Sequence, residues 1–265
     1  MGIHSAFYAS RVVLVGCLFF VWMKMRIIKI TVTAFEQNCR LLIDTDSRTC
    51  IIVDPGGEVD RILSIVNSEH LSILGIFITH SHLDHAGGVS RLLESLSKGS
   101  QANNPVTVFA HPLEKSFRAN IREQSLMFGL SDEGFENCPE PQVLLKEGTE
   151  IRLGALSGQV LESPGHSPGH VVLSFPASDE PLTLEYKGKI MVSYDRSPPV
   201  LIAGDVLFRG SIGRTDLPGG NMQTLLASIK NKILTLPGET LVLSGHGPDT
   251  TIAEEARSNP FLSEL

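Results

Sequence analysis

Residues 79 to 88 read Thr79-His80-Ser81-His82-Leu83-Asp84-His85-Ala86-Gly87-Gly88 and place three histidines and an aspartate within six positions. The apolar run Leu71 to Ile78 comes directly before them, so we expect a buried strand to deliver these side chains to a loop at its carboxyl end. His80 and His82 stand two apart on extended backbone and can turn their imidazoles toward one centre. Asp84 and His85, at the next turn, can reach a second centre. This spacing predicts a metal site rather than a polar surface loop.

Composition limits the kind of protein this is. The chain has 265 residues, 42% of them hydrophobic, which is enough for a sizeable core in one large domain or two small ones. The formal net charge of −7 argues against a nucleic-acid binder, because no basic stripe is available to displace counterions. An anionic substrate stays possible, since two bound divalent cations would reverse the local field. The four cysteines show no Cys-x-x-Cys pair, which is typical of reduced thiols in a reducing compartment.

Residues 1 to 24 form an apolar extension. The uncharged run Val12 to Met23 is too short to cross a bilayer comfortably, and no small-x-small cleavage site follows it. The alternatives are a signal or membrane anchor, or a true start at Met23 or Met25. The second is favoured, because Arg26 to Val32 alternates like the opening strand of a domain. We therefore expect a catalytic domain at 25 to 265, a cytoplasmic location, and membrane association only if residues 1 to 24 are retained as an anchor.

The domain's first half predicts one sheet layer. Three strands in a meander are expected at residues 26–32, 39–44 and 49–54, followed by a helix at 59–68. A strand at 71–79 and a helix from Val89 to Leu96 then continue the order strand, helix, strand, helix. Residues 113–142 are polar and mixed, and they are expected to form a loop and short-helix excursion over the site.

The second half predicts a second set of strands. They are expected at residues 151–153, 157–163, 171–175, 200–203 and 240–243, with a hairpin or loop inserted at 176–198. Asn221 is expected to cap a helix, and a short helix is expected at 251–256.

Four of the predicted strands are followed by side chains that can bind a metal. These are His80 to His85 after the first strand, and His166, Asp205 and His246 after the later ones. A capping aspartate or a turn histidine would explain any one of these placements, but four together are hard to obtain by chance. His111 closes another strand, where a cap or a packed side chain is the more typical role.

The histidine motif with the later His, Asp and His resembles the metallo-β-lactamase superfamily, whose α+β fold is a four-layer αββα sandwich. The resemblance runs from about Met25 to Gly247. Residues 163–170 (SPGHSPGH) and 204–216 (GDVLFRGSIGRTD) are similar to the short bacterial type of hydroxyacylglutathione hydrolase, or glyoxalase II. The resemblance implies two metal ions with this ligand set: His80, His82 and His166 on one, Asp84, His85 and His246 on the other, and Asp205 bridging them.

The resemblance also implies an activity, the hydrolysis of a glutathione thioester such as S-lactoylglutathione. Water between two divalent cations has a pKa of about 7, so a hydroxide would form at neutral pH. The resemblance implies that Asp84 orients this hydroxide and that Asp205 bridges the ions. Mixed imidazole and carboxylate ligands suit zinc and also accommodate iron or manganese. Arg214 stands where the family has a lysine that meets a glutathione carboxylate, and it is the candidate substrate-binding residue. The alternative for Arg214 is an ion pair with Asp216 that fixes the loop.

Other functions remain open from the sequence. A persulfide dioxygenase of the same fold would use a single iron and need only His80, His82 and Asp205. A nuclease is disfavoured by the charge, and a β-lactamase by the branch resemblance and the lack of a clear export signal. A non-catalytic scaffold would predict at least one lost ligand, and all seven candidates are present.

Overall fold

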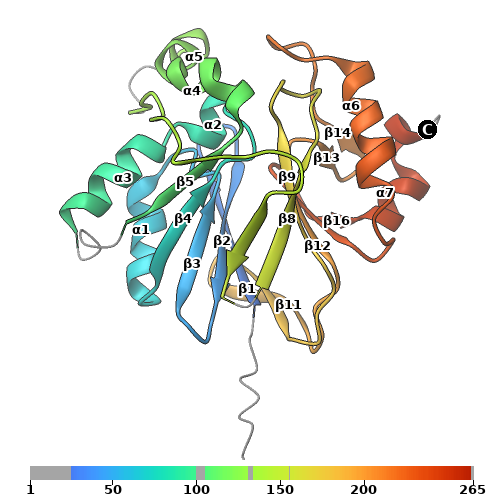
Figure 1. Cartoon of the computed structure of the whole chain (residues 1–265), viewed down its shortest axis with the longest axis horizontal. Helices are drawn as coiled ribbons and strands as arrows, with labels where there is room; N and C mark the ends of the chain where they lie inside the picture. Colours follow the sequence, from blue (N-terminus) through green and yellow to red (C-terminus); the bar gives the residue numbers. More distant parts are fainter. Residues whose placement is uncertain (1–24, 100–104, 131–133, 155, 264–265) are drawn as a thin grey trace, which may run out of the picture.

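The computed structural model describes residues 25–99, 105–130, 134–154 and 156–263, so the expectation for residues 1–24 lies outside the described residues. The described chain forms the expected four layers, with helices on the outer faces of two stacked sheets (Figure 1). Within these ranges, no helix combines the length and the apolar character needed to cross a membrane.

The first sheet has eight strands. They are β1 (Met25–Val32), β2 (Gln37–Asp44), β3 (Thr49–Val53), β4 (Ser72–Phe77), β5 (Thr107–Ala110), β6 (Val143–Leu144), β10 (Leu182–Tyr186) and β11 (Lys189–Tyr194). The sheet order is β11-β10-β1-β2-β3-β4-β5-β6. The predicted meander is confirmed, because β1, β2 and β3 pair antiparallel, and β4, β5 and β6 then add in parallel.

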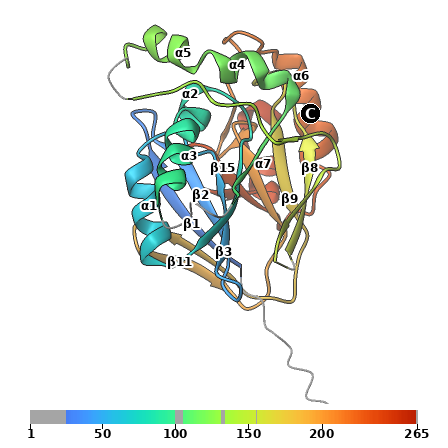
Figure 2. The ribbon, with the colours of Figure 1, turned by 60° about the vertical axis from the view of Figure 1, so that its left-hand side comes forward.

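Strand β1 shows how the alternating sequence builds two apolar layers. Ile28 and Ile30 face the outer helices, whereas Met25 and Ile27 face the second sheet. Helices α1 (Val59–Ser68) and α3 (Val89–Lys98) cover the outer face (Figure 2). They bury one apolar stripe each: Val59, Ile62 and Val66 on α1, and Val89, Leu92 and Leu96 on α3. Because neighbouring residues of a strand point to opposite faces of the sheet, apolar residues on both faces of β1 contribute to two apolar layers, one under the helices and one between the sheets.

The second sheet has six strands in the order β16-β15-β12-β9-β8-β7. They are β7 (Glu150–Leu153), β8 (Leu156–Glu162), β9 (Val171–Phe175), β12 (Val200–Gly204), β15 (Leu241–Ser244) and β16 (Thr250–Thr251). Its outer face packs on α6 (Met222–Ser228), on a π-helical continuation (Ile229–Ile233) and on α7 (Ile252–Ser258), which a 3₁₀ turn (Pro260–Leu262) follows. Asn221 caps α6 as predicted, with its side-chain oxygen accepting a bond of 2.9 Å from the backbone N–H of Thr224.

The segment at 176–198 does more than form an inserted hairpin. Strands β10 and β11 pair antiparallel, and β10 pairs in parallel with β1, with Leu182 opposite Met25. The segment therefore extends the first sheet by two strands. A smaller hairpin of β13 (Leu207–Phe208) and β14 (Ser211–Ile212) follows Asp205.

Strands β4, β8, β12 and β15 each lead into a loop at one end of the two sheets, and these loops carry the candidate metal ligands. Short helices lie across this end (Figure 2): α2 (Leu83–Ala86), a 3₁₀ turn (Pro112–Glu114), α4 (Lys115–Ala119) and α5 (Ile121–Met127). The expected short-helix cover from residues 113–142 is thus confirmed.

Gly56, in the turn after β3, packs directly against the backbone of the segment that carries the candidate ligands at 80–85. A Cβ atom at this position would lie 1.5 Å from the backbone oxygen of Asp84, so no side chain fits. We expect Gly56→Ala to lower the free energy of unfolding by about 3 kcal/mol, because the clashing atoms belong to a backbone that cannot rotate away. Denaturant unfolding measures this.

Gly238→Ala is the matched control, since an added Cβ there would meet Ala253 at 3.3 Å, close to an ordinary contact. Equal unfolding midpoints for the two variants would contradict this prediction, because they would show that the turn at Gly56 accommodates a Cβ atom without loss of stability.

Candidate metal centre

Three imidazoles converge at the first cluster. His80 Nε2 lies 3.1 Å from His82 Nδ1, and His166 Nε2 lies 3.1 Å and 3.0 Å from those same two atoms. All three side chains are buried, and their nitrogens could all bond to one ion. Three imidazole nitrogens around one point are a typical site for zinc or another transition metal.

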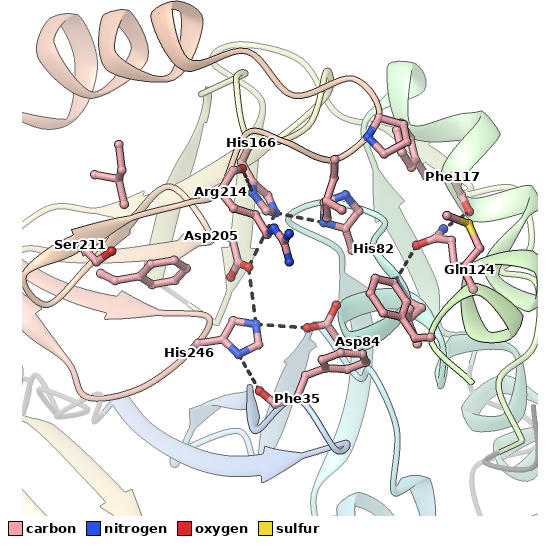
Figure 3. A pocket seen from close by; sticks show the side chains of 17 residues that line it. Phe35, His82, Asp84, Phe117, Gln124, His166, Asp205, Ser211, Arg214 and His246 are labelled. Carbon is pink, nitrogen blue, oxygen red and sulfur yellow. Dashed lines mark hydrogen bonds and ion pairs between the residues drawn. The ribbon is translucent and has the colours of Figure 1, made fainter. Parts of the chain in front are cut away.

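The second cluster contains carboxylates. His246 Nε2 lies 3.1 Å from Asp84 Oδ2, and His85 Nε2 lies 3.8 Å from the same oxygen. Asp205 stands between the two clusters (Figure 3). Its Oδ1 is 3.3 Å from His85 Nε2, and its Oδ2 is 3.4 Å from His246 Nε2 and 3.7 Å from His166 Nε2. The structure thus brings together all seven side chains that the sequence singled out.

Two histidines of the first cluster, His80 and His82, are held in the neutral form. Burial, reinforced by the neighbouring imidazoles, holds the pKa of His80 well below its usual range and lowers that of His82 to about 3. A neutral imidazole has a free lone pair, which is the form that binds a metal.

The second cluster has the opposite character. Burial disfavours charge on His85, but the carboxylates of Asp205, Asp84 and Asp54 raise its pKa well above its usual range. The pKa of His246 is also raised, because its bond to Asp84 and the charge of Asp205 outweigh its burial. Burial opposes the charge on Asp205, yet His85 lowers the pKa of this carboxyl far below its ordinary value. The cluster therefore favours positive charge, which a metal ion supplies in place of the imidazole protons.

Two buried atoms support this fit. Within the described ranges, His85 Nε2 and Asp205 Oδ1 have no hydrogen-bond partner, although they lie only 3.3 Å apart. Buried polar atoms are nearly always satisfied, and a divalent cation between these two would satisfy both. The His and Asp donor set suits divalent metals and does not select among zinc, iron and manganese.

Asp54 orients two of the candidate ligands, a role that was missed in the sequence, where Asp54 read as the last residue of a strand. Its carboxylate accepts bonds from the Thr79 backbone N–H (2.8 Å), the Thr79 hydroxyl (2.7 Å) and His85 Nδ1 (2.9 Å). The Thr79 hydroxyl is in turn 3.1 Å from His80 Nδ1. Asp54 adopts a left-handed backbone conformation (φ 49°), which is strained for a side-chain-bearing residue. The available signal was its place directly before Pro55-Gly56-Gly57.

Other histidines are held by the backbone. His166 Nδ1 donates to the carbonyl of Arg214 (2.7 Å), and His246 Nδ1 donates to that of Phe35 (2.9 Å), so that each presents Nε2 to the centre. His170 lies outside the clusters, where its Nε2 accepts a bond of 3.0 Å from the backbone N–H of Asp205. The sequence motif contained His170 without indicating this role.

Glu114 is a second residue that the sequence did not reveal. Its buried carboxylate accepts bonds of 2.8 Å from the backbone N–H of Ser81 and of Gly169. It therefore ties the loop that carries His80 and His82 to the loop that carries His166. In the sequence, Glu114 is one charged residue among many in a polar segment.

His111 has the cap role that the sequence favoured, and Arg214 forms the ion pair that the sequence left as an alternative. His111 acts as a cap, because its Nδ1 accepts a bond from Leu113 N (3.3 Å), and it does not join either cluster. Arg214 forms a two-bond ion pair with Asp216, at 2.7 Å from Nε and 2.7 Å from Nη2. Arg214 also lines a cavity of about 440 Å³ beside the clusters, so the ion pair and a binding role are compatible (Figure 3).

Glu114→Gln tests the tie between the two metal loops. Glutamine keeps one carbonyl acceptor and places an NH₂ group against the second backbone N–H. We expect a loss of about 1–3 kcal/mol of folding stability and about 10- to 100-fold weaker metal binding, measured by competition with a chelator. Glu123→Gln, on the exposed face of α5, is the control. Metal affinities that match between the two variants would remove Glu114 from the site.

Comparisons with known proteins agree with this geometry. The family model of the metallo-beta-lactamase superfamily matches residues 32–179 and 190–246. The chain is 34% identical over 239 residues to hydroxyacylglutathione hydrolase GloC of Haemophilus influenzae, a match that covers 90% of this chain and 99% of that protein.

Two solved structures are similar as well. The BLEG-1 B3 metallo-beta-lactamase has 34% identity and a TM-score of 0.70, covering 89% of this chain and 99% of that one. TTHA1623 in a di-iron-bound form has 35% identity and a TM-score of 0.68, covering 88% and 99%. With the family model matched over most of its length, the chain belongs to the metallo-beta-lactamase superfamily and is a metallo-hydrolase.

Proposed function

We propose that this protein hydrolyses a glutathione thioester, such as S-lactoylglutathione, at a centre of two divalent metal ions. The proposed ligands are the seven side chains of the two clusters: His80, His82 and His166 on one ion, Asp84, His85 and His246 on the other, and Asp205 on both. Zinc suits the histidine-rich first cluster, and iron or manganese also fits the donor set. The di-iron form of TTHA1623 keeps iron a serious candidate.

The lack of a spare proton donor in the cavity carries this proposal. Among the described residues that line it, the polar side chains beyond the proposed ligands are Gln124, Ser211 and Arg214. None of these is an acid with a pKa near neutrality. An amine leaving group needs such an acid to protonate it. A thiolate leaves unprotonated, because a thiol has a pKa of about 8.5. These groups therefore favour a thioester as the substrate.

Bound divalent cations would supply Lewis acidity, which lowers the pKa of water and polarises a carbonyl group. The chain's own residues would do the rest. Asp84 lies at the cavity surface and can accept a hydrogen bond from the attacking water. This bond would fix the direction in which the lone pair of the water points. The buried imidazoles would hold the metal ions where little solvent surrounds the ligand atoms, which strengthens electrostatic stabilisation.

Arg214 is the proposed contact for a carboxylate of glutathione. It is the one arginine or lysine among the described residues that line the cavity. Its backbone carbonyl accepts a hydrogen bond from His166, which fixes the Arg214 backbone beside the first cluster, and the guanidinium is paired with Asp216. The relative GloC, named a hydroxyacylglutathione hydrolase, supports glutathione as the carrier.

The test of the function is a substrate panel assayed on metal-loaded protein. We expect S-lactoylglutathione to be hydrolysed with a kcat/KM at least about tenfold above that of lactoyl-coenzyme A, because the charged contact to the carrier is made in the transition state. A β-lactam belongs in the panel, since BLEG-1 is named a B3 metallo-beta-lactamase. Faster β-lactam than thioester turnover would assign the site to that reaction.

Asp205→Ala is the control for the chemistry. We expect at least about a 100-fold loss of thioesterase activity with an unchanged far-ultraviolet circular dichroism spectrum, since only the proposed bridge is removed. Retained turnover would exclude the bridging role. One iron per chain in the purified protein, together with oxygen consumption on glutathione persulfide, would instead indicate a dioxygenase.

Arg214→Ala tests the carrier contact. The substitution keeps the backbone carbonyl that holds His166, so we expect the KM for S-lactoylglutathione to rise about tenfold with little change in kcat. A thioester whose carrier has no carboxylate should be hydrolysed equally by both proteins. Arg209→Ala is the control, because Arg209 is exposed nearby and does not line this cavity. An unchanged KM would contradict the contact between Arg214 and the carrier, and the ion pair with Asp216 would remain as its role.

A further inference from the structure

We propose that one side of the cavity is an acyl subsite that selects thioesters with an apolar acyl group. This inference rests on the proposed thioesterase function and adds the class of acyl group to it. The surface concerned, called the acyl wall here, consists of Phe35, Leu83, Phe117, Met127 and Phe128.

The acyl wall stands directly beside the proposed reaction centre. The Phe117 ring meets His82 edge-on, with 5.8 Å between the ring centroids. Phe35 and Phe128 pack edge-to-face, with 5.3 Å between the ring centroids, and Phe35 lies beside Asp84 (Figure 3). An acyl group whose carbonyl carbon lies at the metal clusters would therefore extend over aromatic and aliphatic side chains.

The acyl wall is fixed to the metal loop by Gln124. Its Oε1 accepts a bond of 3.0 Å from the Leu83 backbone N–H, and its Nε2 donates to the carbonyls of Phe117 (2.9 Å) and Ser81 (3.3 Å). These bonds also use both ends of the Gln124 amide. Leu83 and Phe117 are therefore held in place relative to His80 and His82, and Gln124, the polar residue beside the wall, has little hydrogen-bonding capacity left for a substrate hydroxyl.

The exposure of two residues of the acyl wall indicates that a bound ligand covers them. Met127 is 75% exposed and Phe128 is 43% exposed, although both are large apolar residues at the mouth of a cavity. Exposed apolar surface that lines a cavity marks a ligand-binding groove more often than a free surface. Methionine also adapts to ligands of different shape, because it has three rotatable bonds.

Charge assigns the two halves of the substrate to the two sides. Figure 3 shows Phe117 and Gln124 on one side of His82 and Asp84, Ser211 beyond Asp205 on the other, and the Arg214 side chain reaching between Asp205 and His82. The anionic glutathione half belongs with Arg214. The acyl half then faces the acyl wall, where the hydroxyl of a lactoyl group would meet apolar side chains and the already hydrogen-bonded amide of Gln124. A longer unsubstituted acyl chain would gain burial there.

The experiment has two arms on metal-loaded protein. The first measures by calorimetry the Kd of acetate, butanoate and hexanoate, which represent the acyl half alone. The second measures kcat/KM for the S-acetyl, S-butanoyl and S-hexanoyl thioesters of glutathione. Full burial of a methylene is worth about fourfold in affinity, so we expect hexanoate to bind at least about tenfold more tightly than acetate, with the same order in kcat/KM.

Two variants locate the effect. Met127→Gln places an amide in the acyl wall, and we expect it to reduce the hexanoate-to-acetate ratio to about threefold or less. Leu126→Gln is the matched control, because Leu126 is the preceding residue of the same helix, is 64% exposed and does not line the cavity. Its ratio should equal that of the unmodified protein.

The arms separate the two proposals. Equal affinities for the three carboxylates would overturn the acyl subsite even if glutathione thioesters are hydrolysed. Affinity that rises with chain length while no glutathione thioester is turned over would support the subsite and overturn the proposed function. A length dependence that Leu126→Gln abolishes and Met127→Gln leaves intact would place the contact outside the acyl wall.

Discussion

The buried carboxylate of Asp205 is the constraint on which the site depends. It lies 3.3 to 3.7 Å from nitrogens of His85, His246 and His166, which come from three separate loops. A buried carboxylate is costly unless positive charge surrounds it, and the low pKa of Asp205 shows that it stays ionised here. Only a fold that ends several strands at one place can gather enough donors around such a group. The four-layer sandwich does this at the end where β4, β8, β12 and β15 lead into the ligand loops.

Precision at this centre comes from residues that do not belong to either cluster. Asp54 accepts three hydrogen bonds, from Thr79 and His85, and it does so in a left-handed backbone conformation. Such strain persists only where the surrounding structure fixes it, and it tends to occur at functional sites. Glu114 joins two ligand loops through their backbone N–H groups. Asp54 and Glu114 thus orient the candidate ligands from the side away from the cavity. The side that faces the cavity is lined mainly by apolar residues and one arginine.

Local pattern was enough for much of the fold and for the candidate ligands. Alternation in β1 and helical spacing in α1 and α3 act within a few residues, and the histidine motif has a fixed spacing, so each could be predicted from the sequence. Contacts between distant segments could not. Glu114 bonds to backbone N–H groups 33 and 55 residues away, and any residue can supply a backbone N–H. The parallel pairing of β10 with β1 likewise joins Leu182 to Met25 across most of the chain, without a sequence signal.

The most direct measurement of the two-metal centre is anomalous diffraction from crystals of the metal-loaded protein, collected at the zinc and iron absorption edges. Two peaks about 3.5 to 4 Å apart are expected, one among His80, His82 and His166 and one among Asp84, His85 and His246, with Asp205 between them. The absorption edge would also identify the metal. A single peak at full occupancy, with His246 and Asp84 bonded to each other instead of to an ion, would contradict the two-metal centre.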